Sequence, residues 1–198
     1  MPSDSARALD PEYPNLRPDV LDGYRGAPPG VAAEIIGGEL YLLSRPAPRN
    51  QSAAAILSAL LHPPFRWGRG GPGGWIVLPE PELSLGDLPD LAEPDLAGWH
   101  RDRLPTMPED AAIRVVPDWV CEVLSSSTRR HDRFTKMPMY LSHGVGHAWL
   151  LDATAKTLEV FRRTADGWLL ALSAAGDATV RAEPFEAIEI ELRVLWEW

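Results

Sequence analysis

The chain has 198 residues, of which 45% are hydrophobic and 24% charged, a balance typical of a globular protein with one substantial core. Its 28 acidic and 19 basic side chains give a formal charge of −9, which argues against an avid, non-specific nucleic-acid binder. A local basic cleft, or an acidic cleft neutralised by metal ions, stays compatible with this charge. The single cysteine, Cys121, excludes a disulfide framework and a cysteine-based zinc site.

The N-terminal segment, residues 1–30, is rich in Pro, Asp and Arg. We expect it to form an irregular arm with a short helix near residues 17–24, followed by one domain over residues 31–198. No apolar run approaches the ~20 residues that cross a bilayer, and the first residues lack the apolar core of a signal peptide. The sequence therefore predicts a cytoplasmic protein with no membrane partner.

The first regular elements are predicted between residues 32 and 74. Residues 32–44 are two β-like runs joined by a Gly-Gly pair, which predicts an N-terminal β-hairpin. Residues 50–61 carry apolar side chains at helical spacing and predict a helix. The Pro- and Gly-rich residues 62–74 predict a loop. Its segment FRWGRGG has basic residues and a tryptophan that could touch nucleic acid, although a mobile surface loop is the commoner outcome.

The rest of the chain alternates strand-like runs with one helix. The clearest strand covers residues 118–125, and a run of Ser and Thr suited to N-capping then opens a helix over residues 128–143. The order predicts an α/β fold with a central mixed β-sheet flanked by helices. The other predicted strands are residues 75–80, 82–85, 94–99, 147–153, 156–164, 167–174 and 188–196.

Glu122 interrupts the clearest strand. Alternation along a strand places Glu122 on one face with Val120 and Leu124, and Trp119, Cys121 and Val123 on the other. A carboxylate among apolar neighbours costs free energy unless it is paired, protonated or bound to metal. Two interpretations stay equally open: a charge on the solvated face of an edge strand or paired with an arginine, and a functional carboxylate.

Asp95 follows Pro94 at the start of another short predicted strand. Pro-Asp is a common turn pair and by itself indicates little. Two carboxylates on neighbouring strands, however, would supply the oxygen ligands that Mg²⁺ prefers, and such an ion can polarise a phosphodiester and activate water. Asp95 and Glu122 together therefore suggest a metal site.

Lys136 lies on the predicted helix 128–143. The sequence alone favours an i,i+4 ion pair with Asp132, worth a few tenths of a kcal/mol. The functional alternative is a lysine that projects toward Glu122 and stabilises the charge of a phosphoryl transition state. Phe134, Met137 and Leu141 line another face of this helix, which we expect to pack on the sheet.

Several other polar residues have ordinary explanations. Glu34 interrupts the first strand of the hairpin, where an outward charge on an edge strand is the favoured interpretation. The five histidines, His62, His100, His131, His143 and His147, form no tight pair, which argues against a histidine metal site. The hydroxyl run at residues 125–128 lacks the nucleophile elbow of serine hydrolases, and N-capping explains it better.

Taken together, these residues resemble the Uma-two family of restriction endonucleases, a bacterial branch of the PD-(D/E)XK nuclease superfamily. The resemblance covers about residues 30–192 and is most specific over residues 117–152, where the pattern VLS-S-STRR-DR--K-P-Y---GV---WL-D fixes many positions. It includes Pro138, which is awkward inside a helix. The resemblance implies a restriction-endonuclease-like fold and hydrolysis of nucleic-acid phosphodiesters that depends on Mg²⁺, with Mn²⁺ able to substitute.

The resemblance also implies roles for particular residues. Asp95 falls on the aspartate of the family's Pro-Asp pair, Glu122 on its second metal-binding carboxylate, and Glu34 on the hairpin glutamate, an additional acid near the metal. The superfamily lysine two residues after the second acid is Leu124 here, and Lys136 is its natural replacement. The predicted catalytic residues are therefore Glu34, Asp95, Glu122 and Lys136, of which the three acids are the predicted metal ligands.

Two functions remain open at this point. The first is an endonuclease that acts on nucleic acid, with DNA favoured as the substrate. The second is a binding or assembly module that keeps the nuclease fold with little or no activity. The charge of −9 favours the second, as does Asn50, where relatives often carry a histidine. That change either weakens proton transfer or substrate positioning, or replaces one helix cap with another.

The oligomeric state is not encoded in a motif. A symmetric homodimer is usual for nucleases that cut both strands, so we expect one from the class alone. The C-terminal run RVLWEW could pack in the core or at a dimer interface.

Overall fold

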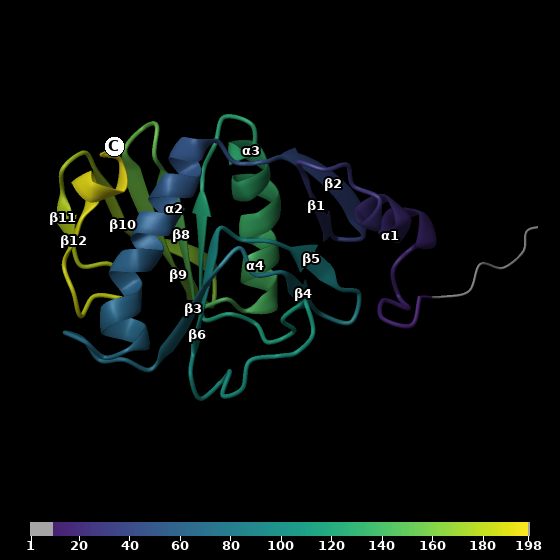
Figure 1. The fold of residues 1–198 in the computed structure, drawn as a ribbon, viewed down its shortest axis with the longest axis horizontal. Coiled ribbons are helices and arrows are strands. Elements are labelled where there is room, and N and C mark those ends of the chain that lie inside the picture. Colours follow the sequence, from purple (N-terminus) through teal and green to yellow (C-terminus); the bar gives the residue numbers. More distant parts are fainter. Residues whose placement is uncertain (1–9, 198) are drawn as a thin grey trace, which may run out of the picture.

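The computed structural model describes residues 10–197 and has a central six-stranded sheet, a four-stranded sheet beside it and a small two-stranded sheet (Figure 1). The helices are α1 (Pro18–Arg25), α2 (Pro48–Leu61), η1 (His62–Arg66), α3 (Arg129–His131), η2 (Asp132–Lys136), α4 (Met137–His143) and η3 (Leu192–Leu195). The strands are β1 (Val31–Ile36), β2 (Glu39–Ser44), β3 (Trp75–Pro79), β4 (Leu83–Leu85), β5 (Asp90–Ala92), β6 (Leu96–His100), β7 (Trp119–Val123), β8 (His147–Asp152), β9 (Thr157–Thr164), β10 (Gly167–Ala175), β11 (Thr179–Val180) and β12 (Ile190–Glu191).

The central sheet has the strand order β10-β9-β8-β7-β6-β3 and is mixed, because β7 and β8 are parallel while the other neighbours are antiparallel. Helix α2 covers one face, and the continuous helix α3–η2–α4 covers the other (Figure 1). A strand buried on both faces needs apolar side chains on both, which explains the nearly unbroken apolar run of β7. The predicted α/β fold with a central mixed sheet is confirmed.

The alternation predicted for the clearest strand is also confirmed. Cys121 and its same-face neighbours pack with Leu57 and Leu61 of α2. Val120 and Leu124 pack with Met137 on the side of α4.

The predicted N-terminal hairpin is present as β1 and β2, which belong to the four-stranded sheet β2-β1-β5-β4. Gly37 and Gly38 have φ values of 61° and 77°, the two positive values that a tight hairpin turn requires. The hairpin joins the rest of the sheet where Ile35 pairs with Leu91 of β5. The short helix predicted near residues 17–24 is α1, and it packs on the same sheet.

The helix predicted over residues 128–143 is present but contains a π-helical turn, η2. A π-turn holds more residues than an α-turn and so rotates the side chains that follow it. Lys136 is buried at 3% exposure, whereas Phe134 is 72% exposed. The prediction that Phe134 packs on the sheet is therefore wrong, while Met137 is buried as predicted.

Two boundaries differ from the sequence predictions. The loop predicted from residue 62 begins only after η1, because a π-turn continues α2 through residues 62–66. The strand predicted over residues 188–196 is mostly wrong, since β12 is followed by the 3₁₀-helix η3. Its apolar side chains, Leu192, Leu195 and Trp196, pack in the core. Within residues 10–197, no helix has the length and apolarity needed to cross a bilayer.

Candidate active site

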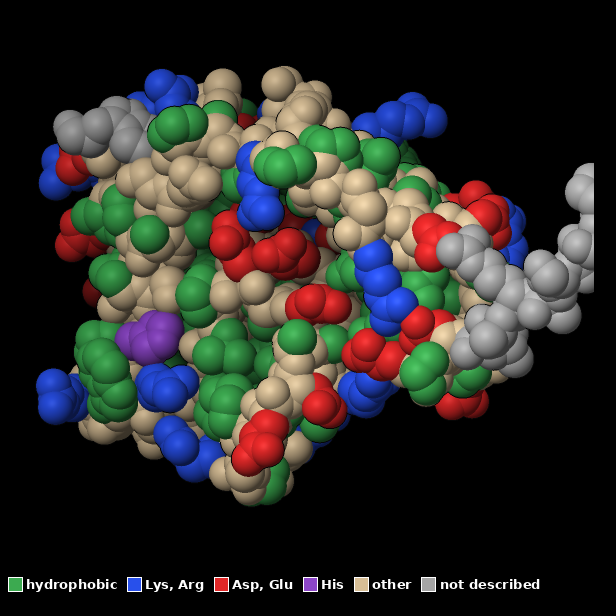
Figure 2. All heavy atoms as spheres, turned by 45° about the vertical axis from the view of Figure 1, so that its right-hand side comes forward, with side chains coloured by type: hydrophobic (Ala, Val, Ile, Leu, Met, Phe, Trp, Pro, Cys, Tyr) green, Lys and Arg blue, Asp and Glu red, His purple; other side chains and the backbone are tan. Residues whose placement is uncertain are grey.

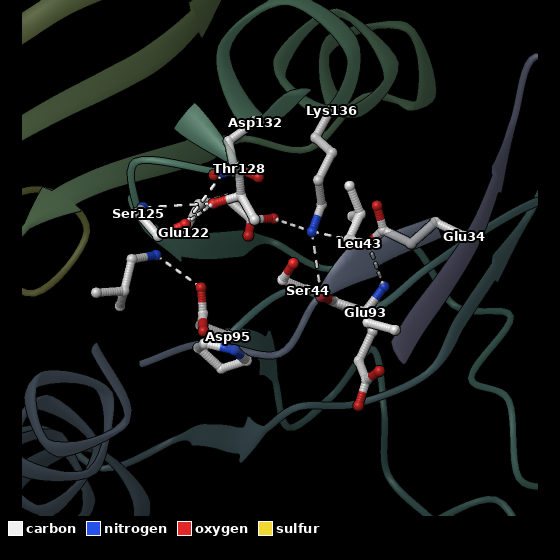
Figure 3. A pocket seen from close by; sticks show the side chains of 13 residues that line it. Glu34, Leu43, Ser44, Glu93, Asp95, Glu122, Ser125, Thr128, Asp132 and Lys136 are labelled. Atoms are coloured by element: carbon white, nitrogen blue, oxygen red, sulfur yellow. Dashed lines mark hydrogen bonds and ion pairs between the residues drawn. The ribbon is translucent and has the colours of Figure 1, made fainter. Parts of the chain in front are cut away.

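Six charged side chains from four parts of the chain line one small cavity of about 70 Å³. The cavity lies where the hairpin, the start of β6, the end of β7 and the helix α3–η2–α4 meet (Figure 3). Figure 2 shows acidic side chains gathered in a hollow of the molecular surface. The six charged residues are Glu34, Glu93, Asp95, Glu122, Asp132 and Lys136.

Lys136 points from η2 into the centre of this group (Figure 3). Its Nζ lies 2.9 Å from Oε1 of Glu34 and 2.8 Å from Oε1 of Glu122, and it donates to the Glu93 carbonyl at 3.1 Å. An ammonium has three hydrogens, so these three contacts use all of them. The exposed pair with Asp132 that the sequence alone favoured is therefore wrong, and the alternative direction, toward Glu122, is the one observed.

Glu122 is buried in the middle of the central sheet, on the face that α4 covers. Its Oε1 accepts a hydrogen bond of 2.5 Å from the Tyr140 hydroxyl in addition to the contact with Lys136. Burial raises the pKa of Glu122 to about 8, with the negative charges of Asp132 and Glu34 acting in the same sense and Lys136 opposing them. The interpretation of Glu122 as a solvated edge-strand charge is wrong.

Asp95 lies at the start of β6, directly beside β7, because Leu96 pairs with Cys121. Its Oδ2 accepts a hydrogen bond of 2.7 Å from the backbone N–H of Val123. Burial raises the pKa of Asp95 to about 7, and the nearby Glu122 carboxylate raises it further, against the effect of the Val123 N–H. The two carboxylates thus stand on neighbouring strands and face the same cavity.

Glu34 is buried on β1 and has partners at both oxygens. Oε1 accepts from the backbone N–H of Glu93 at 3.0 Å and contacts Lys136, while His131 Nε2 donates to Oε2 at 2.7 Å. Burial alone would raise the pKa of Glu34, but the Lys136 charge and the His131 hydrogen bond outweigh it and lower the pKa to about 2. Glu34 is therefore ionised, and the interpretation as an outward surface charge is wrong.

The sequence did not indicate roles at the site for His131, Asp132 and Tyr140. Asp132 is buried against the cavity, and burial raises its pKa to about 6 against the effect of Lys136. The spacing of Asp132, Lys136 and Tyr140 placed them on one helix face, which was the available signal. His131 and Glu34 are 97 residues apart in the sequence, so no local pattern reveals their contact.

Asn50 lies inside α2, whose N-cap is Ala47, so the interpretation as a replaced helix cap is wrong. Its Nδ2 donates to the backbone carbonyls of Val123 and Leu124 at 2.9 and 3.0 Å. The side chain thus connects α2 to the end of β7 at Val123, the residue whose backbone N–H donates to Asp95.

The cavity offers two carboxylates for a divalent cation. Within residues 10–197, no three His, Cys, Asp or Glu side chains are grouped so as to hold a metal ion by themselves. The hydrogen bonds of Asp95 and Glu122 engage Oδ2 and Oε1, which leaves Oδ1 and Oε2 for a ligand. Mg²⁺ is commonly held by one or two carboxylates plus water and substrate phosphate, so this donor set fits it. Burial, with a smaller effect of neighbouring carboxylates, raises the pKa values of Asp95 and Glu122, and a bound cation would favour their ionised forms.

Comparisons with known proteins identify the fold and the family of this chain. No curated protein matches the chain. A solved structure described as a "putative nuclease belonging to DUF820" from Anabaena variabilis ATCC 29413 has the same fold, with a TM-score of 0.69 and 20% sequence identity over 89% of this chain and 97% of that one. The Uma2 (Uma-two) family model, described as "Putative restriction endonuclease", matches residues 17–194. The chain therefore belongs to the Uma2 family, as the sequence resemblance predicted.

Proposed function

We propose that this protein is a Mg²⁺-dependent endonuclease that hydrolyses phosphodiester bonds, with DNA as the substrate. The observation that carries the proposal is the meeting of Lys136 and Glu122 at 2.8 Å in a cavity that Asp95 also lines. These three residues come from three different elements, so no local structural requirement explains why they converge. Membership of a nuclease family supports the same conclusion.

Asp95 and Glu122 are the proposed ligands of the metal. Bound Mg²⁺ would supply Lewis-acid polarisation of the phosphodiester. Glu34 is the third acid that the family resemblance implies near the metal. Because both of its oxygens already have partners, its geometry favours a role as the counter-ion that holds Lys136.

Lys136 is proposed to stabilise the negative charge that develops on the phosphate. Two of its partners are carboxylates and the third is the neutral Glu93 carbonyl. A phosphate oxygen would replace the neutral partner at the smallest electrostatic cost, because the two ion pairs stay intact. Tyr140 orients Glu122 by the hydrogen bond to Oε1, which keeps Oε2 directed at the cavity.

The test is cleavage of plasmid DNA, oligonucleotide duplexes and single strands of DNA and RNA with Mg²⁺ or Mn²⁺. We expect Asp95→Asn to lower the rate by about 100-fold or more, because one ligand of the cation is lost. Glu39→Gln, a charge removal at an exposed position of β2, is the matched control and should leave the rate unchanged. Equal rates in the wild type and in both Asp95→Asn and Lys136→Met would refute the proposal.

The second candidate is a nuclease-fold binding or assembly module with little or no activity. The specific observation in its favour is that Lys136 has all three hydrogens satisfied within the protein. Calorimetry separates the two candidates. A catalytic site binds Mg²⁺ or Mn²⁺ in a way that Asp95→Asn and Glu122→Gln each abolish, whereas a module without a metal site shows no such dependence. The homodimer stays an expectation from the class, to be measured by light scattering.

A further inference from the structure

An exposed tryptophan and three arginines form a compact surface at the far end of β6 from Asp95. Trp67 is 57% exposed, and the Arg69 guanidinium lies 5.4 Å from the centre of its ring. Arg101 follows β6 directly, and its Nη2 donates to the backbone carbonyl of Arg66 at 3.3 Å. We call Arg66, Trp67, Arg69 and Arg101 the arginine–tryptophan surface.

The loop that carries this surface is folded back and fixed by backbone hydrogen bonds. The N–H of Arg69 donates to the Pro63 carbonyl at 2.8 Å, and the N–H of Gly73 donates to the Pro64 carbonyl at 2.9 Å. A Cβ at Gly71 would lie 2.5 Å from Cβ of Pro64, so only glycine permits this close return of the chain. The backbone that carries the aromatic ring and the charges is thus fixed before any partner arrives, which lowers the entropic cost of binding.

The charges of this surface are not neutralised by the protein. Within residues 10–197, Arg66, Arg69 and Arg101 have no carboxylate at ion-pair distance. Other arginines of the described chain do have one, including Arg17, Arg25, Arg103, Arg114, Arg129, Arg133, Arg162, Arg181 and Arg193. The chain has 28 acidic and 19 basic side chains, so a cluster of three arginines without carboxylate partners favours binding of an anion from outside the protein.

The position relative to the proposed active site follows from the strand. Asp95 and Arg101 flank β6, six residues apart along an extended strand, which corresponds to roughly 20 Å at ~3.3 Å per residue. The loop after α2 leaves at the lower left of Figure 1, and Lys and Arg side chains gather in the corresponding part of Figure 2, on the face with the acidic hollow.

The acidic cavity by itself repels a polyanion, so a nucleic-acid substrate needs a second, basic contact. Arginine supplies that contact to phosphates, and an exposed tryptophan provides a stacking platform for an unpaired base. We propose that the arginine–tryptophan surface binds a single-stranded segment of the nucleic-acid substrate. The roughly 20 Å between Asp95 and Arg101 corresponds to about six nucleotides at the ~3.4 Å rise of a stacked strand, so the bound segment lies about six nucleotides from the scissile phosphate. This inference rests on the proposed function and deepens it by naming the substrate-docking surface.

The test is binding of fluorescently labelled single strands and duplexes, of DNA and of RNA, measured by anisotropy in EDTA over a range of NaCl concentrations. Arg69→Ala/Arg101→Ala should flatten the slope of log K against log salt by about 1.4 on single strands. Trp67→Ala should weaken single-strand binding about tenfold and leave the salt slope unchanged. Arg17→Ala/Arg181→Ala, which removes two exposed, ion-paired arginines and gives the same net charge, is the matched control and should bind as the wild type does.

The outcomes separate this inference from the proposed function. Loss of binding in the surface variants but not in the control supports the surface, whether or not the wild type cleaves. Cleavage that depends on Asp95, together with binding that none of the surface variants changes, overturns the surface and leaves the proposed function standing. Tight binding to anionic vesicles in place of nucleic acid also overturns it. Thermal unfolding of each variant confirms that it is folded before binding is measured.

Discussion

Replacement of Lys136 by methionine removes the buried cation of the site while keeping a side chain of similar length. In the wild type, Nζ lies within 3 Å of an oxygen of both Glu34 and Glu122, and all three side chains are 3–4% exposed. Without Lys136, two buried carboxylates lose their counter-charge. Removal of one partner of a buried ion pair typically destabilises a protein by about 3–5 kcal/mol.

The pKa shift of Glu34 gives an independent magnitude for this destabilisation. The surroundings of Glu34 lower its pKa from 4.5 to about 2, mainly through Lys136 and His131 acting against burial. At 1.36 kcal/mol per pKa unit, this shift corresponds to about 3 kcal/mol of stability. In the wild type this contribution is present above the unfolded pKa of 4.5 and is lost as the pH falls toward 2.

The variant should show the opposite pH dependence. Without Lys136, burial raises the pKa of both glutamates above the unfolded value, so each takes up a proton near neutral pH. The cost of folding then grows as the pH rises through that range. We expect Lys136→Met to be destabilised by about 3 kcal/mol at pH 5, where the wild-type contribution of Glu34 is present, and by more at pH 8.

The assay is equilibrium urea unfolding in EDTA, followed by tryptophan fluorescence at the two pH values. Lys156→Met makes the same substitution at an exposed turn and should change the free energy of unfolding by less than about 0.5 kcal/mol. The double variant Glu34→Gln/Lys136→Met should lose less free energy of unfolding than the sum of the two single variants. The reason is that Glu34→Gln removes the charge that Lys136→Met leaves unpaired. A loss that is below about 1 kcal/mol, or equal at both pH values, would refute the reasoning.

Two further outcomes follow from the site. The affinity for Mg²⁺ or Mn²⁺, measured by calorimetry, should increase on the order of 100-fold between pH 6 and 8. The reason is that the ion displaces protons from the carboxyls of Asp95, with a pKa of about 7, and Glu122, with a pKa of about 8. An affinity independent of pH would contradict the assignment of these ligands. Asn50→Ala should lower the free energy of unfolding by about 2 kcal/mol, because two backbone carbonyls at the end of β7 lose their donor. The neighbouring exposed change Gln51→Ala is its control, and an equal effect of both would show that the two hydrogen bonds contribute nothing.

The sequence by itself determined the elements that have a strong local pattern. The alternation of β7, the Gly-Gly turn of the hairpin and the amphipathic helix 128–143 are all present, because side-chain period and turn chemistry act over a few residues. The family pattern likewise lies in the sequence, and the match over residues 17–194 bears it out. The short strands β5 and β11 were not predicted. The C-terminal run was predicted wrongly, because its apolar pattern fits a strand and a buried 3₁₀-helix equally well.

Only the tertiary structure decided what the charged residues do. A local pattern made Lys136 a partner of Asp132 and made Glu34 a surface charge, because spacing along a helix or a hairpin was the only information at hand. The fold instead brings Glu34, Glu122 and Lys136 together from β1, β7 and η2, and the π-turn sets the direction of the lysine. The physical reason is that burial makes ion pairing obligatory: once the sheet and helices exclude water, each of these charges needs a partner nearby, and long-range packing selects which one it finds.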